Sequence, residues 1–430
     1  MDDSGEVPKT ESAIDRLERL RSESAGHRVV SIPLLKGSGH LVVDHLLVQE
    51  IFKSQDFVRP PFFRKAFGDG LLLSDGERWA HSRKVIQPEL SPTAVRSMQD
   101  VIDDCIKELQ TDWSRASEED RSVPLVEDIA SCVLRITVRV LFGVDLGARD
   151  PRALSVVRLT AASNELAGLG VFDPRAMVGG RLINALQKER TDVESLAAEL
   201  IASRRDAPDA GACPVDLLDH LLDPAFIEAP VADGGCPVGH KGLIEEMVLL
   251  LLASVETTTA STSNTLQLLA DHPACTERLR ADLPDGTWVQ ACFRESLRLR
   301  PPVWFNGRVA LERFELSSGD TIESGDHVYV CPYLIHRDPL LWEEPDRFLP
   351  ERFIDGVVRE GASFMPFGLG RHYCVGSGLA TAISTSLVSS ILANHDVSIE
   401  VSSDHEPGGG FLLGPSLGSR ARITPTSRPG

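Results

Sequence analysis

The decapeptide FGLGRHYCVG at residues 367–376 places one cysteine, Cys374, among glycines and just after the basic side chains of Arg371 and His372. Glycine lets a backbone turn sharply and approach a flat ligand closely. An apolar stretch that predicts a helix, SGLATAISTSLVSSIL, follows at residues 377–392, and the positive end of a helix stabilises a nearby thiolate. A thiolate is one of the axial ligands of haem iron. The segment therefore predicts either a haem-binding loop or a buried structural cysteine in a glycine-rich turn.

The residues around this cysteine have the order found in one known family. The segment resembles the haem-binding loop of the cytochrome P-450 family at six positions: Phe367, Gly370, Arg371, His372, Cys374 and Gly376. The resemblance implies that Cys374 is the metal ligand and binds the iron of haem b as a thiolate. It also implies that four neighbours of Cys374 contact the cofactor, namely Phe367, Gly368, His372 and Gly376.

The composition is that of an ordinary globular protein. The 430 residues are 42% hydrophobic and 25% charged, which suffices for a large core. The formal net charge of −19 argues against nucleic acid as a general partner, because phosphate binding requires clustered Lys and Arg. The eight cysteines form no CxxC pair, which argues against a zinc knuckle and predicts a reducing, cytoplasmic location. The longest apolar run, MVLLLLA at 247–253, is too short to span a bilayer, so no membrane anchor is expected.

Residues 241–272 predict one long helix with polar residues in its apolar middle. Glu256 and Thr257 lie there, in ASVETTTAST at 253–262. A buried carboxylate is unfavourable unless it is paired or used, and an acid beside a hydroxyl can hold water for proton delivery. A helix whose polar face meets solvent is the alternative. The segment resembles the oxygen-activating helix of the P-450 family, which implies that Glu256 and Thr257 are catalytic; Ser254 stands where the family usually has Gly or Ala.

A further helix, predicted at about 285–299, carries the sequence FRESLRLRPP. Glu295 and Arg298 lie three positions apart on one helix face and can form an ion pair, although such pairs are common and weak on surfaces. Before the double proline, the pair resembles the ExxR helix of the family. The resemblance implies a structural role for Glu295 and Arg298, with Arg352 of the segment FLPERF as the third member.

Haem carries two propionates, which cationic side chains and N–H donors bind well. Trp79 and Arg83 lie four positions apart in the predicted helix GERWAHSRKVIQP, so they share a face. Arg308 follows the double proline, and His372 lies two residues before the cysteine. Each residue alone is typical of a solvated surface or, for Trp79, of a core. Their joint occurrence in the order of the family implies that all four bind the cofactor.

The fold class that we expect is mainly α with small β-sheets, because most of the chain has helical periodicity. Strands are predicted at only two places, 28–45 and 314–333. The resemblance implies a single cytochrome P-450 catalytic domain at 28–430, preceded by a polar N-terminal extension at 1–27. It also implies that haem lies between the long central helix and the helix that follows Cys374.

By resemblance, the substrate pocket is lined by apolar and aromatic side chains, as ligand pockets usually are. The residues expected to line it are Phe62, Phe63, Phe67, Ala253, Val303, Trp304, Phe305, Phe411 and Leu412. They favour a lipophilic substrate, such as a terpenoid or polyketide intermediate, although core aromatics give the same sequence pattern. Arg59 and Arg64 remain open as anchors for a substrate carboxylate.

These motifs together predict a haem-thiolate monooxygenase that inserts one oxygen atom of O2 into a lipophilic molecule, by hydroxylation or epoxidation, in secondary-metabolite biosynthesis. The resemblance implies electron supply from a separate ferredoxin and ferredoxin reductase, docked on a basic patch of Lys84, Arg96 and Arg371. Two alternatives stay open: a peroxide-driven or non-oxygenating haem-thiolate enzyme, and a non-catalytic haem-binding sensor. The presence of Glu256 and Thr257 argues against both alternatives.

Overall fold

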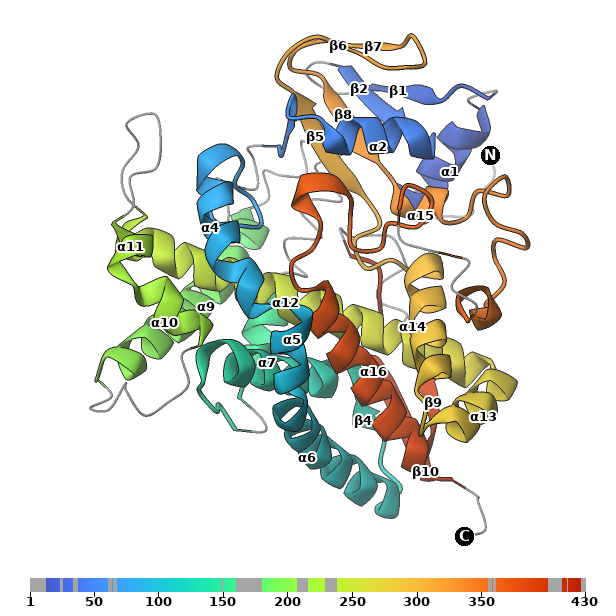
Figure 1. Ribbon diagram of the computed structural model, residues 1–430. Helices are drawn as coiled ribbons and strands as arrows, with labels where there is room; N and C mark the ends of the chain where they lie inside the picture. The colour runs from blue at the N-terminus through green and yellow to red at the C-terminus, as the bar shows by residue number, and fades with distance from the viewer. Residues whose placement is uncertain are drawn as a thin grey trace, which may run out of the picture.

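The computed structural model shows a mainly helical protein with small sheets at one end (Figure 1). The expected fold class is therefore confirmed. The structure describes residues 13–23, 26–33, 38–60, 64, 68–147, 150–159, 180–206, 216–228, 238–354, 358, 361–400, 412–415 and 417–426. Within these ranges, no helix combines the length and hydropathy that crossing a membrane requires.

The helices and strands that organise the molecule are named here with their bounds. The helices are α1 (Ala13–Glu23), α2 (His45–Lys53), α4 (Gly76–Glu89), α5 (Pro92–Ser97), α6 (Gln99–Glu118), α7 (Leu125–Phe142), α9 (Gly180–Asp206), α10 (Leu217–Leu222), α11 (Pro224–Ile227), α12 (Gly239–Asp271), α13 (Pro273–Asp282), α14 (Thr287–Leu299), α15 (Pro332–Ile335), η2 (Pro350–Phe353), η3 (Gly370–His372) and α16 (Ser377–Asn394). The strands are β1 (Val29–Pro33), β2 (Ser38–Val42), β3 (Phe57–Val58), β4 (Val123–Pro124), β5 (Asn306–Ala310), β6 (Phe314–Glu315), β7 (Thr321–Ile322), β8 (His327–Val330), β9 (His395–Glu400) and β10 (Arg420–Pro425).

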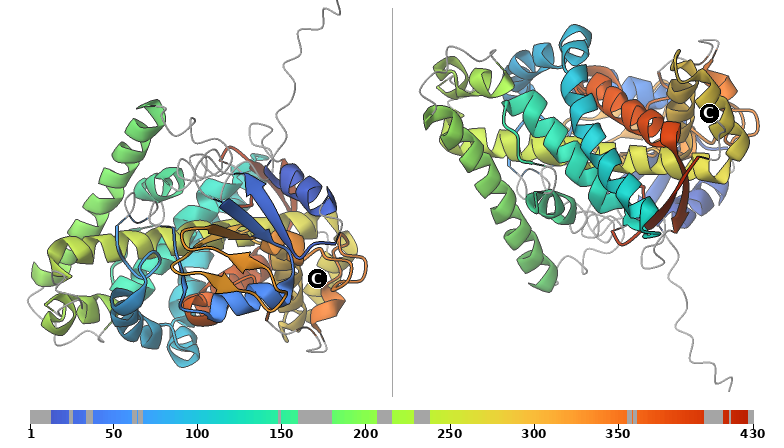
Figure 2. Two further views of the ribbon diagram at one scale, coloured as in Figure 1. Left: turned by 90° about the horizontal axis from the view of Figure 1, so that it is seen from above. Right: turned by 90° about the horizontal axis from the view of Figure 1, so that it is seen from below.

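Helix α12 runs through the length of the molecule (Figure 2). Its apolar side chains, among them Leu251, Val255 and Leu266, are fully buried in the main hydrophobic core, where α12 packs against α7 and α16. This packing of a long apolar helix confirms the helix predicted at 241–272. The helix ends before Pro273, but the same proline begins α13, which the sequence did not predict; proline suits a first helical position because its missing N–H has no partner there.

The strands form a five-stranded sheet in the order β1-β2-β8-β5-β3, a three-stranded sheet β4-β10-β9 and the hairpin β6-β7. Both predicted strand regions are confirmed, as β1-β2 in the first and β6, β7 and β8 in the second. The prediction that strands occur only there is wrong. The strands missed are either two residues long, with no readable alternation, or pair with distant segments, as β9 does with β10.

The first helix, α1, lies within the N-terminal segment that was expected to be a polar extension. Ile14 and Leu17 are buried in a cluster that also contains Trp304 and Phe305. This amphipathic helix thus adds an apolar stripe to the core near the large sheet. The domain boundary at residue 27 stays a prediction.

Candidate active site

The cysteine loop joins η3 to α16, which begins three residues after Cys374. Cys374 is exposed on this loop, and its backbone N–H donates to the carbonyl of Phe367 at 3.0 Å. Gly370 has a φ of +67°, in the left-handed region that favours glycine, and a Cβ there would overlap the carbonyl oxygen of Phe52 in α2. The backbone is therefore held tightly against α2 while the thiol remains accessible.

Helix α4 carries two of the predicted cofactor-binding residues to this loop. The ring of Trp79 lies 4.7 Å from the ring of His372, centroid to centroid. Arg83 donates through Nη1 to the carbonyl of Tyr373 at 2.9 Å, and its guanidinium lies 5.5 Å from the centroid of the Trp79 ring. The four-residue spacing thus places both side chains on one face, as the sequence indicated.

A cluster of buried cations lies beside these residues. Arg308 of β5 is 8% exposed, and burial lowers its pKa to about 10. Burial also lowers the pKa of Arg59 to about 9, and the positive charge of Arg308 is the next cause. Asp75 partly balances the cluster: its Oδ1 lies 3.2 Å from Nε2 of His372, and its Oδ2 accepts a hydrogen bond from the backbone N–H of Arg59.

These residues fit a haem group. Arg308 is buried and Arg59 is half-buried, and the charge of Arg308 lowers the pKa of Arg59, so a carboxylate between the two guanidiniums would favour both charged forms. Nδ1 of His372 is buried without a hydrogen-bond partner, which leaves a polar atom for a further ligand group. The nearby thiol of Cys374 is of the type that would serve as the iron ligand of a haem held there.

Arg59 belongs to this group of side chains, which no sequence motif indicates. The residue was considered only as an anchor for a substrate carboxylate. Pairing of β3 with β5 brings it to Arg308, with Phe57 opposite Ala310 and Val58 opposite Val309. A two-residue strand has no detectable period, so only the folded chain reveals the proximity.

The predicted proton-delivery residues lie in the middle of α12. Glu256 and Thr257 are both half-buried, and the Thr257 hydroxyl donates to the carbonyl of Ala253 at 2.7 Å. Ser254 donates in the same way to the carbonyl of Leu251 at 3.2 Å. Each hydroxyl oxygen therefore keeps lone pairs that can accept a further hydrogen bond.

The ExxR residues form a fully buried ion pair. Arg298 donates through Nε and Nη2 to the two carboxylate oxygens of Glu295, each at 2.8 Å. The remaining Arg298 N–H groups donate to backbone carbonyls, including that of His336 at 2.9 Å. Arg352 of η2 lies 3.4 Å from Glu295, so the predicted third residue is within ion-pair distance.

The predicted substrate pocket is only partly visible. Phe62, Phe63, Phe67 and Phe411 lie outside the described residues. Val303 pairs with Leu412 in an isolated bridge, and Ala253 is half-buried on α12. Trp304 and Phe305 are 3% and 5% exposed and pack with Tyr329 and Leu413, so the contacts that they show are those of a core.

The expected docking patch consists of exposed residues. Lys84 and Arg96 are exposed on α4 and α5, and the exposed Arg371 lies 5.1 Å over the Trp79 ring. Their accessibility suits a docking role, which stays a prediction.

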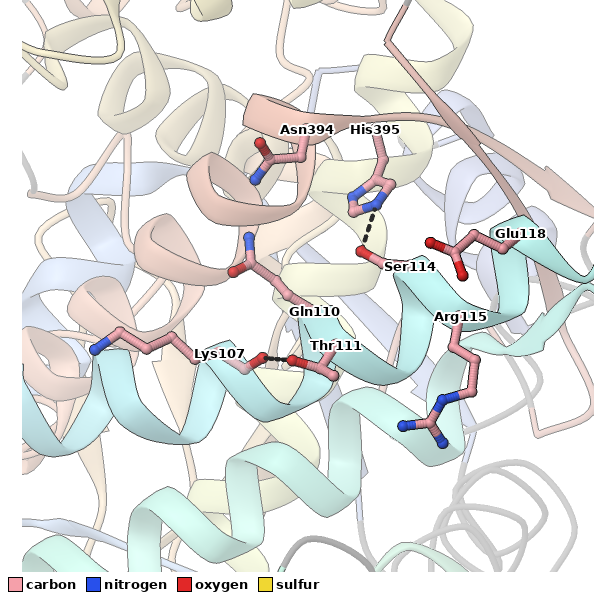
Figure 3. A pocket seen from close by; sticks show the side chains of 8 residues that line it. All are labelled: Lys107, Gln110, Thr111, Ser114, Arg115, Glu118, Asn394 and His395. Atoms are coloured by element: carbon pink, nitrogen blue, oxygen red, sulfur yellow. Dashed lines mark hydrogen bonds between the residues drawn. The ribbon is translucent and has the colours of Figure 1, made fainter.

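A surface groove of about 500 Å³ lies elsewhere, between α6 and the junction of α16 with β9 (Figure 3). Its walls are polar, formed by Lys107, Gln110, Thr111, Ser114, Arg115, Glu118, Asn394 and His395. The 18 residues of α16, roughly 27 Å at 1.5 Å per residue, separate it from the cysteine loop. The groove is not part of the candidate site.

Comparison with known proteins agrees with the fold and the loop. The family model described as Cytochrome P450 matches residues 23–419, most of the chain. The chain therefore belongs to the cytochrome P450 family, whose cofactor is a thiolate-ligated haem, and it is an oxidoreductase of the monooxygenase kind.

Individual relatives share about a quarter of their residues with this chain. The cyclooctat-9-en-7-ol 5-monooxygenase of Streptomyces melanosporofaciens is 27% identical over 87% of this chain and 83% of its own length. Cytochrome P450 714D1 of Oryza sativa subsp. japonica is 27% identical over 89% of this chain and 73% of its own. The cyclooctatin synthase of S. melanosporofaciens is 24% identical over 75% of this chain and 72% of its own.

Proposed function

We propose that this protein inserts one oxygen atom of O2 into a lipophilic organic molecule, by hydroxylation or epoxidation, during the biosynthesis of a secondary metabolite. The observation that carries the proposal is the accessible thiol of Cys374. It lies on a loop beside the guanidiniums of Arg59 and Arg308, which can bind an anion. An iron ligand next to partners for two propionates suits haem b. Haem with a thiolate ligand would activate dioxygen, so that one oxygen atom enters the substrate and the other leaves as water with two protons and the two electrons that the donor proteins supply.

In this proposal, each side chain around the loop has a distinct task. Cys374 would bind the iron through Sγ, and the guanidiniums of Arg59 and Arg308 would donate to the propionates. His372 and Trp79 lie in ring contact, which supports a joint role at the edge of the porphyrin. Three further residues, together with the cation Arg83, complete the proposed cofactor contacts: Phe367, Gly368 and Gly376.

Glu256 and Thr257 of α12 are proposed to deliver protons to the bound oxygen. The Thr257 hydroxyl already donates to a helix carbonyl, so its oxygen is free to accept from water or substrate. Glu256 is half-buried next to Thr257, and its carboxyl group would pass protons to a water molecule held by the neighbouring hydroxyl.

The proposed electron donors are a ferredoxin and a ferredoxin reductase in the cytoplasm. The exposed cations Lys84, Arg96 and Arg371 lie near the cysteine loop and would attract an acidic partner. No disulfide joins the six cysteines in the described part of the chain, which supports a reducing compartment.

The proposed substrate class is an unsaturated, mostly apolar alcohol or hydrocarbon of terpenoid type. One relative is named for 5-monooxygenation of cyclooctat-9-en-7-ol and another for synthesis of cyclooctatin. The apolar side chains of the Val303–Leu412 bridge and of Ala253 in α12 support a lipophilic ligand.

Oxygen insertion is tested by incubating the holoprotein with NADPH, ferredoxin, ferredoxin reductase and a panel of terpenoid alcohols that includes cyclooctat-9-en-7-ol, under isotopically labelled dioxygen. We expect a product that carries one labelled oxygen atom and forms only with both donor proteins. Equal turnover with hydrogen peroxide alone would favour the peroxide-driven alternative. Ligand-induced spectral shifts without any product would favour the sensor.

A further inference from the structure

A buried carboxylate joins α12 to the segment that leads into α4. Glu246 is 0% exposed, and its Oε2 accepts hydrogen bonds from Nη2 of Arg78 at 3.0 Å and from Oγ of Ser82 at 2.6 Å. Its Oε1 accepts from the backbone N–H of Leu71 at 2.7 Å. A carboxylate is buried without great loss only where donors surround it. All three donors lie between Leu71 and Ser82, so Glu246 attaches this stretch of chain to α12.

The residues just before this stretch lie against α12 too closely for ordinary side chains. A Cβ on Gly70 would lie 2.9 Å from Cδ1 of Leu249 and 3.1 Å from Cα of Glu246. Gly68 has a φ of +99°, and its Cβ would lie 2.6 Å from the side chain of Glu245. A side chain at either position would therefore push the stretch away from α12, so glycine at both positions permits the close approach that the hydrogen bonds to Glu246 require.

Helix α4 connects the contacts at Glu246 with the cysteine loop (Figure 1). Trp79 and Arg83 directly follow the two side-chain donors to Glu246 in the sequence. Arg83 in turn donates to the carbonyl of Tyr373, the residue before the proposed iron ligand. The chain of contacts therefore runs from α12 through α4 to the loop.

We infer that Glu246 is a positioning residue, whose bonds to Arg78 and Ser82 seat α4 on α12 and thereby fix where Trp79 and Arg83 meet the cofactor. The inference rests on the proposed haem site. A variant without this carboxylate leaves the guanidinium of Arg78 buried with no carboxylate opposite it.

The test compares Glu246→Gln with Glu245→Gln in the haem-loaded full-length protein. Glutamine keeps the size and one acceptor oxygen but removes the charge. Glu245 is the matched control because its side chain is partly exposed, pairs with Lys241 of α12 and accepts only a backbone N–H, that of Asp69, for which glutamine keeps an acceptor. Two rates are measured: amide hydrogen exchange by peptide, and haem transfer to an apo-haem acceptor protein. For Glu246→Gln we expect about tenfold faster exchange at 71–89 and about tenfold faster haem transfer, with exchange in α14 unchanged. For Glu245→Gln we expect changes within about twofold.

Three outcomes overturn the inference. Unchanged exchange at 71–89 shows that Glu246 does not hold α4. Equally faster amide exchange in residues 71–89 and in α14 shows that the variant lowers global stability and that Glu246 does not act locally on α4. Faster exchange at 71–89 with an unchanged rate of haem transfer shows that the attachment of α4 to α12 does not position Trp79 and Arg83 for the cofactor. A wild-type protein without a haem-thiolate spectrum refutes the proposed function itself, and this is seen before any variant is made.

Discussion

The hydroxyl of Thr257 donates to the carbonyl of Ala253, which leaves its oxygen available as an acceptor in the middle of α12. Thr257→Ala removes this acceptor, so protons are delivered poorly and reducing equivalents are lost to water or peroxide. We expect product per NADPH to fall by about 100-fold, at the lower end of what a positioned acid–base group contributes. The measurement is product formed against NADPH consumed. Thr257→Ser keeps a hydroxyl and serves as control; an alanine variant as well coupled as wild type would contradict the assigned role.

Arg308 is the more buried of the two guanidiniums proposed to bind propionates. Arg308→Ala removes a charge-assisted hydrogen bond, which contributes about 1.5–3 kcal/mol, so haem should dissociate roughly 10- to 100-fold faster. Haem transfer to an apo-acceptor protein measures the rate. Lys107→Ala, at the remote polar groove, is the control and should have no effect. An unchanged rate in Arg308→Ala would assign the cationic cluster to something other than haem.

At the scale of elements, α14 carries a buried ion pair between Glu295 and Arg298, and Arg298 also donates to the carbonyl of His336 outside the helix. Glu295→Gln leaves Arg298 uncompensated where neither side chain is exposed, so we expect a loss of about 3–5 kcal/mol in the free energy of unfolding. Urea unfolding monitored by circular dichroism measures it. The matched control is Glu351→Gln, because the Arg278–Glu351 pair is 3.2 Å long but more than half exposed, and its loss should amount to less than about 1 kcal/mol. Equal losses in both variants would count against the structural role of Glu295.

His336 connects α15 to the segment that precedes the cysteine loop and predicts acid sensitivity. Its Nε2 accepts from the backbone N–H of Met365 at 2.9 Å, and burial, followed by the charge of Arg298, lowers its pKa to about 3. In the unfolded chain this imidazole binds a proton near its ordinary pKa of 6.5, whereas in the folded chain it does not. Its contribution to stability is thus complete above the unfolded pKa and declines as pH falls toward 3, by at most about 1.4 kcal/mol per pH unit.

The variant His336→Gln separates this effect from other titrating groups. Glutamine keeps an acceptor but does not titrate, so the decline in unfolding free energy between about pH 7 and about pH 5 should be shallower than in wild type. Urea unfolding at the two pH values gives the slopes. Identical slopes would show that His336 takes up no proton in this range on unfolding.

At the scale of the whole molecule, the sequence predicted what is local or strongly periodic. The helical class and α12 follow from long apolar periodicity, and the cysteine loop from residues that adjoin in the chain. The ExxR pair needed only a three-residue helical spacing, and its contact in the structure follows from that spacing. Such features depend on neighbours in the chain, so no knowledge of the fold is required.

Features made by distant segments were not predictable in this way. Arg59 lies near Arg308 because the two-residue strand β3 pairs with β5. Strands β9 and β10 pair although some twenty residues separate them in the chain. The stretch that carries Ile14 looked like a polar extension because one apolar stripe on a short helix gives a weak signal. The contacts of Glu246 could not be predicted for the same reason, because its hydrogen-bond donors lie 164 to 175 residues earlier in the chain.

The most direct test of the account is the absorption spectrum of the reduced protein with carbon monoxide, for wild type and for Cys374→Ala. The account predicts a red-shifted Soret band in wild type, typical of a thiolate opposite carbon monoxide, and its absence in the variant. No haem in wild type, or a spectrum typical of histidine ligation, would contradict the central claim. The same red-shifted band in Cys374→Ala would show that the ligand is a different residue.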